Sequence, residues 1–395
     1  MSAHALPAPV GGRIWTPTFR LLAAIFGVGA LLMVWRFAMG LGAATGLSDG
    51  YPWGIWIAFD VVVGTALGCG GYAMALLVYI FNRGQFHALV RPAILTSALG
   101  YTMASFAIHL DVGRPLYIYK IPVMPQWWNL NSVLLEVAVC VMTYVAVLWI
   151  ELSPAFFERW MESSSTFLRR ISRTFHPIVQ KLMVPILAIG LLLPTMHQSS
   201  LGAVMLLAGQ KLHGLWQTPL LPLLFLLSCV GMGYAIVAFE SHLGAAAFGR
   251  GRDTAMLARL ARVTGGVVAV YLAIRAVDIV ARGRLGLAFH PSLVALCFWA
   301  EIVLFGYGAF LLLSQRRATV SGQLNAAILV VVGGSLYRLD TYLVAYNPGA
   351  NWKYFPSFTE VFITIAIIAL EIMAYVVIVK LFPIIGGLEP TRARS

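Results

Sequence analysis

Ten long runs of apolar residues, separated by short polar stretches, dominate the chain. They cover about residues 19–42, 55–81, 91–110, 131–151, 180–207, 219–241, 263–281, 291–314, 323–346 and 359–382. Each run is close to the roughly 20 apolar residues that a helix needs to cross a bilayer. The pattern predicts an all-α, polytopic membrane protein of about ten transmembrane helices. Residues 1–395 then form a single integral membrane domain, because no soluble domain interrupts the runs.

Composition supports this prediction. The 395 residues are 60% hydrophobic and 11% charged, with a mean hydropathy of +0.85. A soluble domain carries about 25% charged residues, so the chain is too poor in charge for that class.

The net charge of +12 reflects topology rather than a nucleic-acid partner. With alternating helix directions, 18 of the 27 Lys and Arg residues fall on one side of the membrane and 6 on the other, and 3 lie within the runs. By the positive-inside rule the side with 18 is cytoplasmic. An even number of helices then places both termini in the cytoplasm, in the inner membrane of a bacterium.

Two kinds of connecting segment stand out. Residues 152–179 form the longest polar stretch, which we interpret as a cytoplasmic linker with an amphipathic piece. The predicted outer loops at 51–53, 117–128 and 346–355 are rich in Trp, Tyr and Pro. Such aromatic residues either anchor a protein at the membrane interface or form a docking surface for a partner.

Eleven ionisable residues lie inside the predicted helices, most of them in the outer half of the bilayer. They are Arg36, Asp60, His109, Glu136, His197, Arg275, Asp278, Glu301, Arg338, Asp340 and Glu371. A charge at membrane depth is costly, and it usually faces a bundle interior or a water-filled cavity. The group therefore predicts an internal polar path for protons or a polar ligand, although each polar stripe taken alone can also be an interhelical hydrogen-bond seam.

The fifth apolar run contains a predicted break. Pro194 removes a backbone hydrogen bond, and the polar residues 195–200 follow it directly. Broken membrane helices line cavities or are buried in protein, which makes His197 a candidate ligand-binding residue. Among the buried charges, Arg275 and Asp278 have helical spacing for an ion pair, whereas Arg338 is expected to pair across helices because Asp340 is only two residues away.

Cofactor chemistry narrows the possibilities. The four cysteines are far apart and form no cluster motif, so this chain is not expected to ligate an iron–sulfur cluster or another metal. His109 and His197 both fall in the outer half and form a candidate pair of haem ligands, which keeps a haem-bearing cytochrome b as an alternative. A secondary transporter is the other alternative, because it also combines a broken helix with buried acids.

Five segments of the chain resemble a known family. They are residues 52–60, 81–87, 111–114, 131–136 and 193–200, with the sequences PWGIWIAFD, FNRGQFH, DVGR, NSVLLE and LPTMHQSS. These motifs resemble the polysulfide-reductase membrane-subunit (NrfD-like) family, and within it most closely the Hyb-type membrane subunits of [NiFe]-hydrogenases. The resemblance runs over nearly the whole chain.

The resemblance implies four-helix bundles and a quinone-reactive anchor subunit of a respiratory hydrogenase. Such subunits pass electrons from a periplasmic iron–sulfur protein, itself reduced by the hydrogenase small and large subunits, to menaquinone or ubiquinone, and they generally lack haem. The implied quinone pocket lies near the outer face among helices two to five. We expect His197, His109, Asp60, Asp111, Arg36 and Arg338 to form it, with Glu136, Asp60 and His109 as proton relays. The acids Glu136, Glu151, Glu371 and Glu240 are candidates for a proton route across the membrane.

Overall fold

The computed structural model describes residues 5–249, 251 and 253–387 of the chain. Ten of its helical segments are long and apolar enough to cross a membrane. They are Pro17–Met39, Trp56–Ile80, Gly84–Asp111, Val133–Met161, Thr166–Leu206, Leu221–Phe248, Thr254–Ala281, Leu293–Leu313, Val320–Val344 and Phe358–Leu381. The ten predicted helices are confirmed one for one.

The elements follow one another along the chain with few residues between them. The long helices are α1 (Pro17–Met39), α5 (Val90–Asp111), α7 (Val133–Met161), α8 (Thr166–Leu206), α9 (Leu221–Phe248), α10 (Thr254–Ala281), α11 (Leu293–Leu313), α12 (Val320–Leu339) and α13 (Phe358–Leu381). The second span is built from η1 (Trp56–Val61), α3 (Val62–Leu67), α4 (Gly70–Ala75) and η2 (Leu76–Ile80). Short helices occupy the connections: α2 (Leu41–Ala44), η3 (Gly84–Leu89), η4 (Pro115–Tyr117), α6 (Lys120–Val123), η5 (Pro125–Trp127), η6 (Gly209–Lys211), η7 (Leu285–Phe289) and η8 (Gln315–Ala318), while η9 (Asp340–Val344) extends α12.

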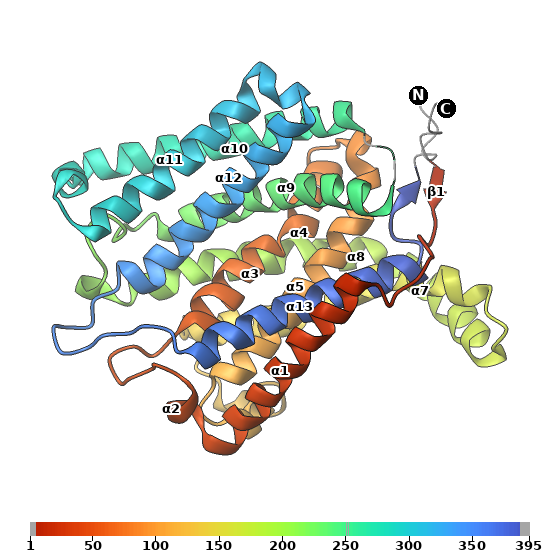
Figure 1. Cartoon of the computed structure of the whole chain (residues 1–395), viewed down its shortest axis with the longest axis horizontal. Helices are drawn as coiled ribbons and strands as arrows, with labels where there is room; N and C mark the ends of the chain where they lie inside the picture. Colours follow the sequence, from red (N-terminus) through yellow and green to blue (C-terminus); the bar gives the residue numbers. More distant parts are fainter. Residues whose placement is uncertain (1–4, 250, 252, 388–395) are drawn as a thin grey trace.

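The spans group into two four-helix bundles and a pair. The second to fifth spans form the first bundle, in which α7 packs along α8 and α5 lies between α4 and α7. Helices α9 to α12 form the second bundle, and α9 joins the two through α3, α4 and α8. Helices α1 and α13 pack against each other on the outside of the first bundle, next to α5 (Figure 1). The predicted four-helix bundles are therefore present.

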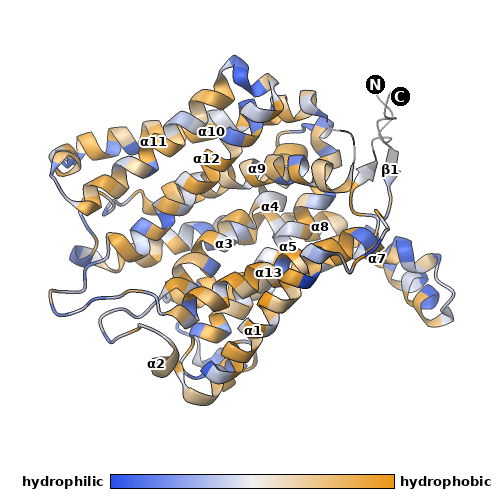
Figure 2. Cartoon of the chain, in the orientation of Figure 1, coloured by the Kyte–Doolittle hydropathy of each residue, from blue (hydrophilic) through white to orange (hydrophobic). Residues whose placement is uncertain are grey.

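Both ends of the described chain lie on the same face of the molecule. Strand β1 (Ala5–Pro7) pairs antiparallel with strand β2 (Gly386–Gly387), and the two ends leave the structure side by side (Figure 1). We call this face the N/C face and the opposite one the loop face. Figure 2 shows that the helices are mostly hydrophobic between these faces, with hydrophilic residues concentrated at the helix ends. Termini on one side agree with an even number of spans.

The connection between the fourth and fifth spans is a helical hairpin. Helix α7 continues to Met161 and α8 starts at Thr166, so nearly all of residues 152–179 are helical rather than an irregular linker. At about 1.5 Å per residue, the 41 residues of α8 span about 61 Å, roughly twice the hydrocarbon thickness of a bilayer. The hairpin extends beyond the bundle on the N/C face, and it is rich in hydrophilic residues (Figure 2).

The predicted break in the fifth span is wrong. Helix α8 is continuous through Pro177, Pro185 and Pro194. Pro194 removes only one backbone donor, and the polar residues after it bond back to their own helix: the Thr195 hydroxyl donates to the Leu191 carbonyl (2.8 Å) and the Ser199 hydroxyl to the Thr195 carbonyl (2.8 Å). These bonds leave the polar run compatible with a regular helix.

The helix of the second span is irregular. It begins and ends in π-helical turns, and Gly68 and Cys69 separate α3 from α4. Asp60 lies in the first π-helical turn, and a second π-helical segment begins at Asp340 in the ninth span. Wide turns of this kind occur frequently at functional sites.

Candidate functional site

A hollow of about 860 Å³ opens on the loop face between the end of α1 and the end of α5. Its walls are Arg36, Phe37, Gly40, Ser105, Phe106, His109, Gly113, Arg114, Pro115, Leu116 and Tyr117. Apolar rings and a few charged donors thus face the same space. Ligand sites for flat organic molecules have this composition, in which apolar walls bury the ligand and a few polar groups orient it.

Arg36 lines this hollow from the end of α1. It is almost fully buried, its Nε donates to the carbonyl of Leu110 (2.6 Å), and its Nη2 donates to the carbonyl of Val112 (2.8 Å). These carbonyls lie at the C-terminal end of α5, where backbone acceptors have no partner within the helix. Asp111 lies near enough to interact electrostatically with Arg36, and its Oδ1 bonds to no other described residue.

His109 lines the same hollow from α5. Its Nδ1 lies 2.8 Å from the carbonyl of Ser105 one turn earlier, so we assign the proton to Nδ1. The ring is exposed to the hollow, which leaves Nε2 available to a ligand. Arg36 and His109 therefore line one hollow, and Asp111 lies beside Arg36 outside that lining.

Asp60, His197 and Arg338 lie elsewhere, in the bundle interior. Asp60 accepts a hydrogen bond from the Thr364 hydroxyl on α13 (2.7 Å). Arg338 donates to the carbonyl of Val62 (2.9 Å) in the first bundle and to that of Phe225 (2.8 Å) in the second. The structure thus places two of the six predicted pocket residues in the hollow, Asp111 beside it, and the other three in the interior.

The surroundings of His197 are aromatic and polar. The ring is buried, it makes an edge contact with Tyr101 (5.7 Å between centroids), and neither ring nitrogen bonds to another described residue. Tyr101 also contacts Tyr144 and lies 3.4 Å from the sulfur of Cys69. Gln198 donates to the hydroxyl of Thr65 (3.1 Å), so this part of α8 is tied to the second span.

Glu136 lies apart from both groups. It is half-buried in the first turn of α7, and its side chain has no hydrogen bond or ion pair with a described residue in the structure. Ser132 caps this turn by accepting from the amide of Leu135 (3.3 Å). A carboxylate in a first helical turn is stabilised by the helix dipole, which is the simplest account of its position.

The predicted charge pairs are corrected by the structure. Arg275 does not pair with Asp278: its Nη2 lies 3.2 Å from Oε1 of Glu301 on α11, whereas Asp278 pairs with Arg282 one turn later (2.6 Å). Arg338 pairs with no carboxylate of the described chain: its Nη1 and Nη2 donate to two backbone carbonyls and one hydroxyl, and its Nε bonds to no described residue. Spacing along one helix does not determine which neighbouring helix supplies the partner.

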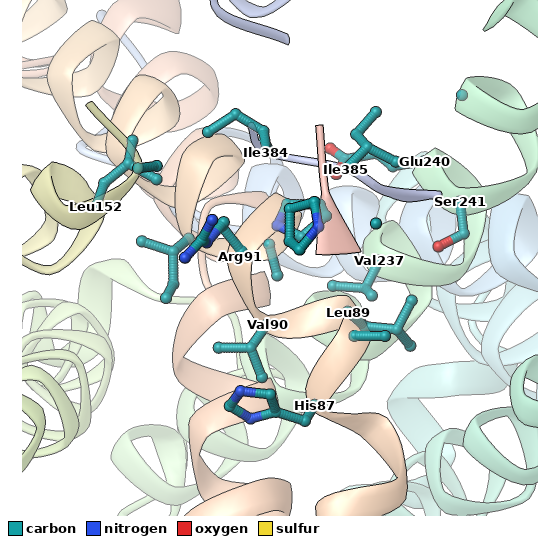
Figure 3. A pocket seen from close by; sticks show the side chains of 18 of the residues that line it. His87, Leu89, Val90, Arg91, Leu152, Val237, Glu240, Ser241, Ile384 and Ile385 are labelled. Atoms are coloured by element: carbon teal, nitrogen blue, oxygen red, sulfur yellow. The ribbon is translucent and has the colours of Figure 1, made fainter. Parts of the chain in front are cut away.

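A second large cavity, of about 910 Å³, opens on the N/C face and was not expected from the sequence. Its ionisable lining includes Glu151, Glu158, Glu240 and Arg91, and the C-terminal residues Ile384 and Ile385 cross one side of it (Figure 3). Arg91 is neutralised by Glu158 (2.8 Å) and also donates to the carbonyl of Pro383 (2.9 Å). The remaining acids make the cavity net acidic, although this face of the chain is rich in basic residues.

Acidic side chains connect this cavity to the first bundle. Glu240 accepts from the Thr96 hydroxyl (2.8 Å), and Glu371 lies near enough to interact electrostatically with both Glu240 and Asp60. A side-chain carbon on Gly100 would lie 3.4 Å from Oε1 of Glu371, which places that carboxylate at the crossing of α5 and α13. The acids Glu240, Glu371 and Asp60 therefore form a series from the cavity into the interior.

His109 and His197 are not placed as a pair of haem ligands. His197 on α8 contacts Tyr101 of α5. His109 lies eight residues beyond Tyr101 on α5, which is about 12 Å along the helix axis. Two axial ligands must face each other across one iron, and these rings point to different spaces. His242 lies 2.8 Å from the amide of Gln323. Among the described residues no cluster of three His, Cys, Asp or Glu side chains can hold a metal ion.

Comparison with known proteins identifies the family of this chain. Residues 43–345 match the polysulphide reductase NrfD family. The chain belongs to the NrfD family. It is also 39% identical over 391 residues to the probable Ni/Fe-hydrogenase 2 b-type cytochrome subunit of Escherichia coli strain K12, covering 97% of this chain and 96% of that protein.

More distant NrfD-related proteins carry quinone-related names. The integral membrane subunit of menaquinone reductase from Nitratidesulfovibrio vulgaris is 28% identical over 370 residues, covering 87% of this chain and 85% of that protein. The integral membrane subunit of an Hdr-like menaquinol oxidoreductase from Archaeoglobus fulgidus is 23% identical over 396 residues, covering 92% of each chain.

Proposed function

We propose that this NrfD-family protein is the quinone-reactive anchor subunit of a respiratory [NiFe]-hydrogenase in the bacterial inner membrane. The observation that carries the proposal is the hollow on the loop face, where His109, Arg36 and aromatic side chains converge at the end of two membrane-spanning helices. The names of the relatives favour a redox subunit over the secondary transporter. By the charge distribution the loop face is periplasmic, so an iron–sulfur partner subunit there can deliver electrons directly to this site.

Reduction of a quinone to a quinol takes up two electrons and two protons. The electrons come from hydrogen, through the hydrogenase large and small subunits and the iron–sulfur subunit. The protein must orient the quinone and supply protons to its two carbonyl oxygens. We assign the orienting role to Arg114, whose donors face the hollow, and a supporting role to Arg36. We assign a proton-transfer role to His109, because its Nε2 can accept a proton while Nδ1–H stays bonded to the Ser105 carbonyl.

The test of this site uses the intact hydrogenase complex in membranes. We expect His109→Gln to lower hydrogen-dependent reduction of a soluble quinone analogue at least tenfold, because an amide can form hydrogen bonds but cannot transfer a proton as an imidazole does. Reduction of a viologen dye, which accepts electrons directly from the hydrogenase subunits, should stay unchanged. The matched control is His290→Gln, because His290 is an exposed residue of the loop face that does not line the hollow. Unchanged quinone reduction in His109→Gln would remove the hollow as the site.

Glu136 has a separate test. We propose it as a proton relay because its carboxylate is half-buried on the loop-face end of α7 with no bonded partner among the described residues. Glu136→Gln keeps the shape but cannot release a proton. We expect a fall in quinone-linked hydrogen oxidation with viologen reduction retained. If quinone-linked activity stays at the wild-type level, the relay role is wrong.

We also propose that protons reach the interior from the N/C face through Glu240, Glu371 and Asp60, with Glu151 as a further acid in the cavity. Support comes from the acidic cavity and from the electrostatic contact of Glu371 with the other two acids. Glu240→Gln should abolish proton uptake from the N/C side of proteoliposomes during quinone reduction. Uptake at the wild-type stoichiometry in that variant would exclude this route.

A further inference from the structure

The second bundle contains a buried ionic cluster that the proposed function does not use. Arg275 on α10 and Glu301 on α11 form an ion pair (3.2 Å) in which both side chains are fully buried. The indole nitrogen of Trp216 donates to the other carboxylate oxygen of Glu301 (3.2 Å). Glu301 is therefore bonded on both oxygens, whereas Arg275 uses only one of its three nitrogens in this pair.

Aromatic rings enclose the guanidinium of Arg275. Its central carbon lies 5.5 Å from the ring centre of Phe298, 5.5 Å from that of Tyr337 and 5.9 Å from that of Trp216. Tyr271 contacts Tyr337 with 5.4 Å between ring centres. The faces of these rings stabilise a cation, but they do not satisfy its remaining N–H groups.

Six buried polar atoms in this region bond to no other described residue. They are Nε and Nη1 of Arg275, the hydroxyls of Tyr271 and Tyr337, Nε of Arg338 and Oδ2 of Asp340. Tyr271 and Tyr337 each lie near enough to Arg275, Glu301 and Arg338 to interact with them electrostatically. Such a concentration is unusual, because buried polar groups in native proteins are bonded to protein or to ordered water.

The same atoms have the chemistry that holds water. Five of the six can donate and one accepts, and hydroxyl groups can do both. A buried water commonly makes about three hydrogen bonds to groups that protein alone leaves unsatisfied. An apolar ligand would leave all six atoms unpaired, and a further protein side chain cannot reach into a closed helical bundle.

We propose that a cluster of ordered water molecules lies among Arg275, Tyr271 and Tyr337 and extends to Arg338. It solvates the buried ion pair and thereby allows both groups to stay charged within the membrane. Because Arg338 also donates to Val62 of the first bundle, the water cluster joins Glu301 and Trp216 to the polar interior around His197. The inference is independent of the quinone site, since its evidence lies entirely in the second bundle and at Arg338.

Hydroxyl-radical footprinting on the complete membrane complex tests the proposal without any substitution. A brief X-ray pulse makes radicals from bound water inside the protein, and these oxidise the nearest side chains. The matched control is Tyr342, which is equally buried but donates its hydroxyl to the carbonyl of Leu201 (2.8 Å). We expect Tyr271 and Tyr337 to be oxidised at least fivefold faster than Tyr342. Equal, low rates at all three tyrosines would overturn the proposal.

Tyrosine-to-phenylalanine variants give a second, independent readout. In a dry cluster, Tyr337→Phe removes an unsatisfied hydroxyl and should leave the thermal midpoint unchanged or raise it. In a hydrated cluster, the same variant removes a bond to water, lowers the midpoint by several degrees, and slows oxidation of Tyr271. Tyr342→Phe removes a hydroxyl that is bonded to the Leu201 carbonyl, so its change in thermal midpoint shows how much the loss of one such bond costs. A neutral Tyr337→Phe beside a destabilised Tyr342→Phe would contradict the water cluster, and Tyr271→Phe serves if Tyr337→Phe does not assemble.

Discussion

Arg36 and Arg338 are stabilised in the interior by oxygen atoms of the backbone. Each guanidinium donates to two carbonyls on segments distant in sequence, and Arg338 adds the hydroxyl of Ser228 (3.3 Å). The planar fork of an arginine suits two acceptors at once, whereas an ammonium group is a compact point charge. Arg36 therefore ties α1 to the end of α5, and Arg338 ties α12 to both the second span and α9.

Replacing Arg36 by lysine tests this role. We expect Arg36→Lys to lower the free energy of unfolding by about 1–3 kcal/mol, because one buried carbonyl at the end of α5 loses its donor. Arg20→Lys, on the exposed side of the same helix, should change stability by less than about 0.5 kcal/mol. Thermal unfolding in detergent measures both. Equal stability of the two variants would mean that the bonds of Arg36 contribute nothing.

The pair Arg275 and Glu301 allows a double substitution. Arg275→Met leaves a carboxylate buried without its partner and should cost about 3–5 kcal/mol, or prevent folding. Arg275→Met combined with Glu301→Met removes both charges and should recover most of that loss. Expression and thermal unfolding of the two variants give the comparison. A double variant less stable than the single one would show that the pair is a net stabiliser.

The sequence was sufficient to predict which ionisable residues lie inside the membrane spans, but not which residues they pair with. The apolar runs identified eleven ionisable residues inside the spans, and eight of these are buried. His109 is exposed to the hollow, and Glu136 and Glu371 are half-buried. Which acid meets Arg275 depends on the rotation of α10 against α11, and one helix's spacing carries no information about that rotation.

Among the elements, the second and ninth spans carry the π-helical turns. Asp60 and Asp340 both lie in such turns, and the Asp60 carboxylate reaches Thr364 of α13 from there. A π-helical turn has no residue signature of its own, so it could not be located before the fold was known. Pro194 was a visible signal, but the membrane helix accommodates it because its polar neighbours bond to their own backbone.

Close helix packing at one glycine can be tested against a neighbouring glycine. A side-chain carbon on Gly29 of α1 would collide with Cβ of Ala366 on α13, whereas one on Gly27 would meet nothing within 4 Å. We expect Gly29→Ala to destabilise the protein by about 1–3 kcal/mol through forced separation of the helices. Gly27→Ala should be neutral or slightly stabilising, because alanine is the better helix former. Thermal midpoints of the two variants decide.

At the scale of the whole molecule, the proposed cytoplasmic position of the N/C face can be tested by labelling. Ser164 lies exposed at the tip of the hairpin on the N/C face, and Asn351 lies exposed on the loop face. With a cytoplasmic N/C face, a membrane-impermeant maleimide should label Asn351→Cys in intact spheroplasts and Ser164→Cys only after the membrane is opened. The native Cys69, Cys140 and Cys229 are buried and should contribute little background. The reversed labelling pattern would invert the topology, including the proposed direction of electron entry.

The number of spans was accessible from the sequence, because hydrophobic length determines it, and the four-helix bundles were implied by the family resemblance. The cavity on the N/C face could not be predicted, since its lining comes from segments far apart in the sequence, from Pro7 to residues 384–386. Only the folded chain brings those segments together.

The pairing of the first and last helices constrains the order of assembly during synthesis. Helix α1 is inserted early, yet its main neighbour α13 emerges more than 300 residues later. Until then the only described bonds that can hold the buried end of α1 are those from Arg36 to Leu110 and Val112, which become available once the third span is in place. The last step of assembly is therefore the docking of α13 and β2 onto α1 and β1, the segments that are synthesised first.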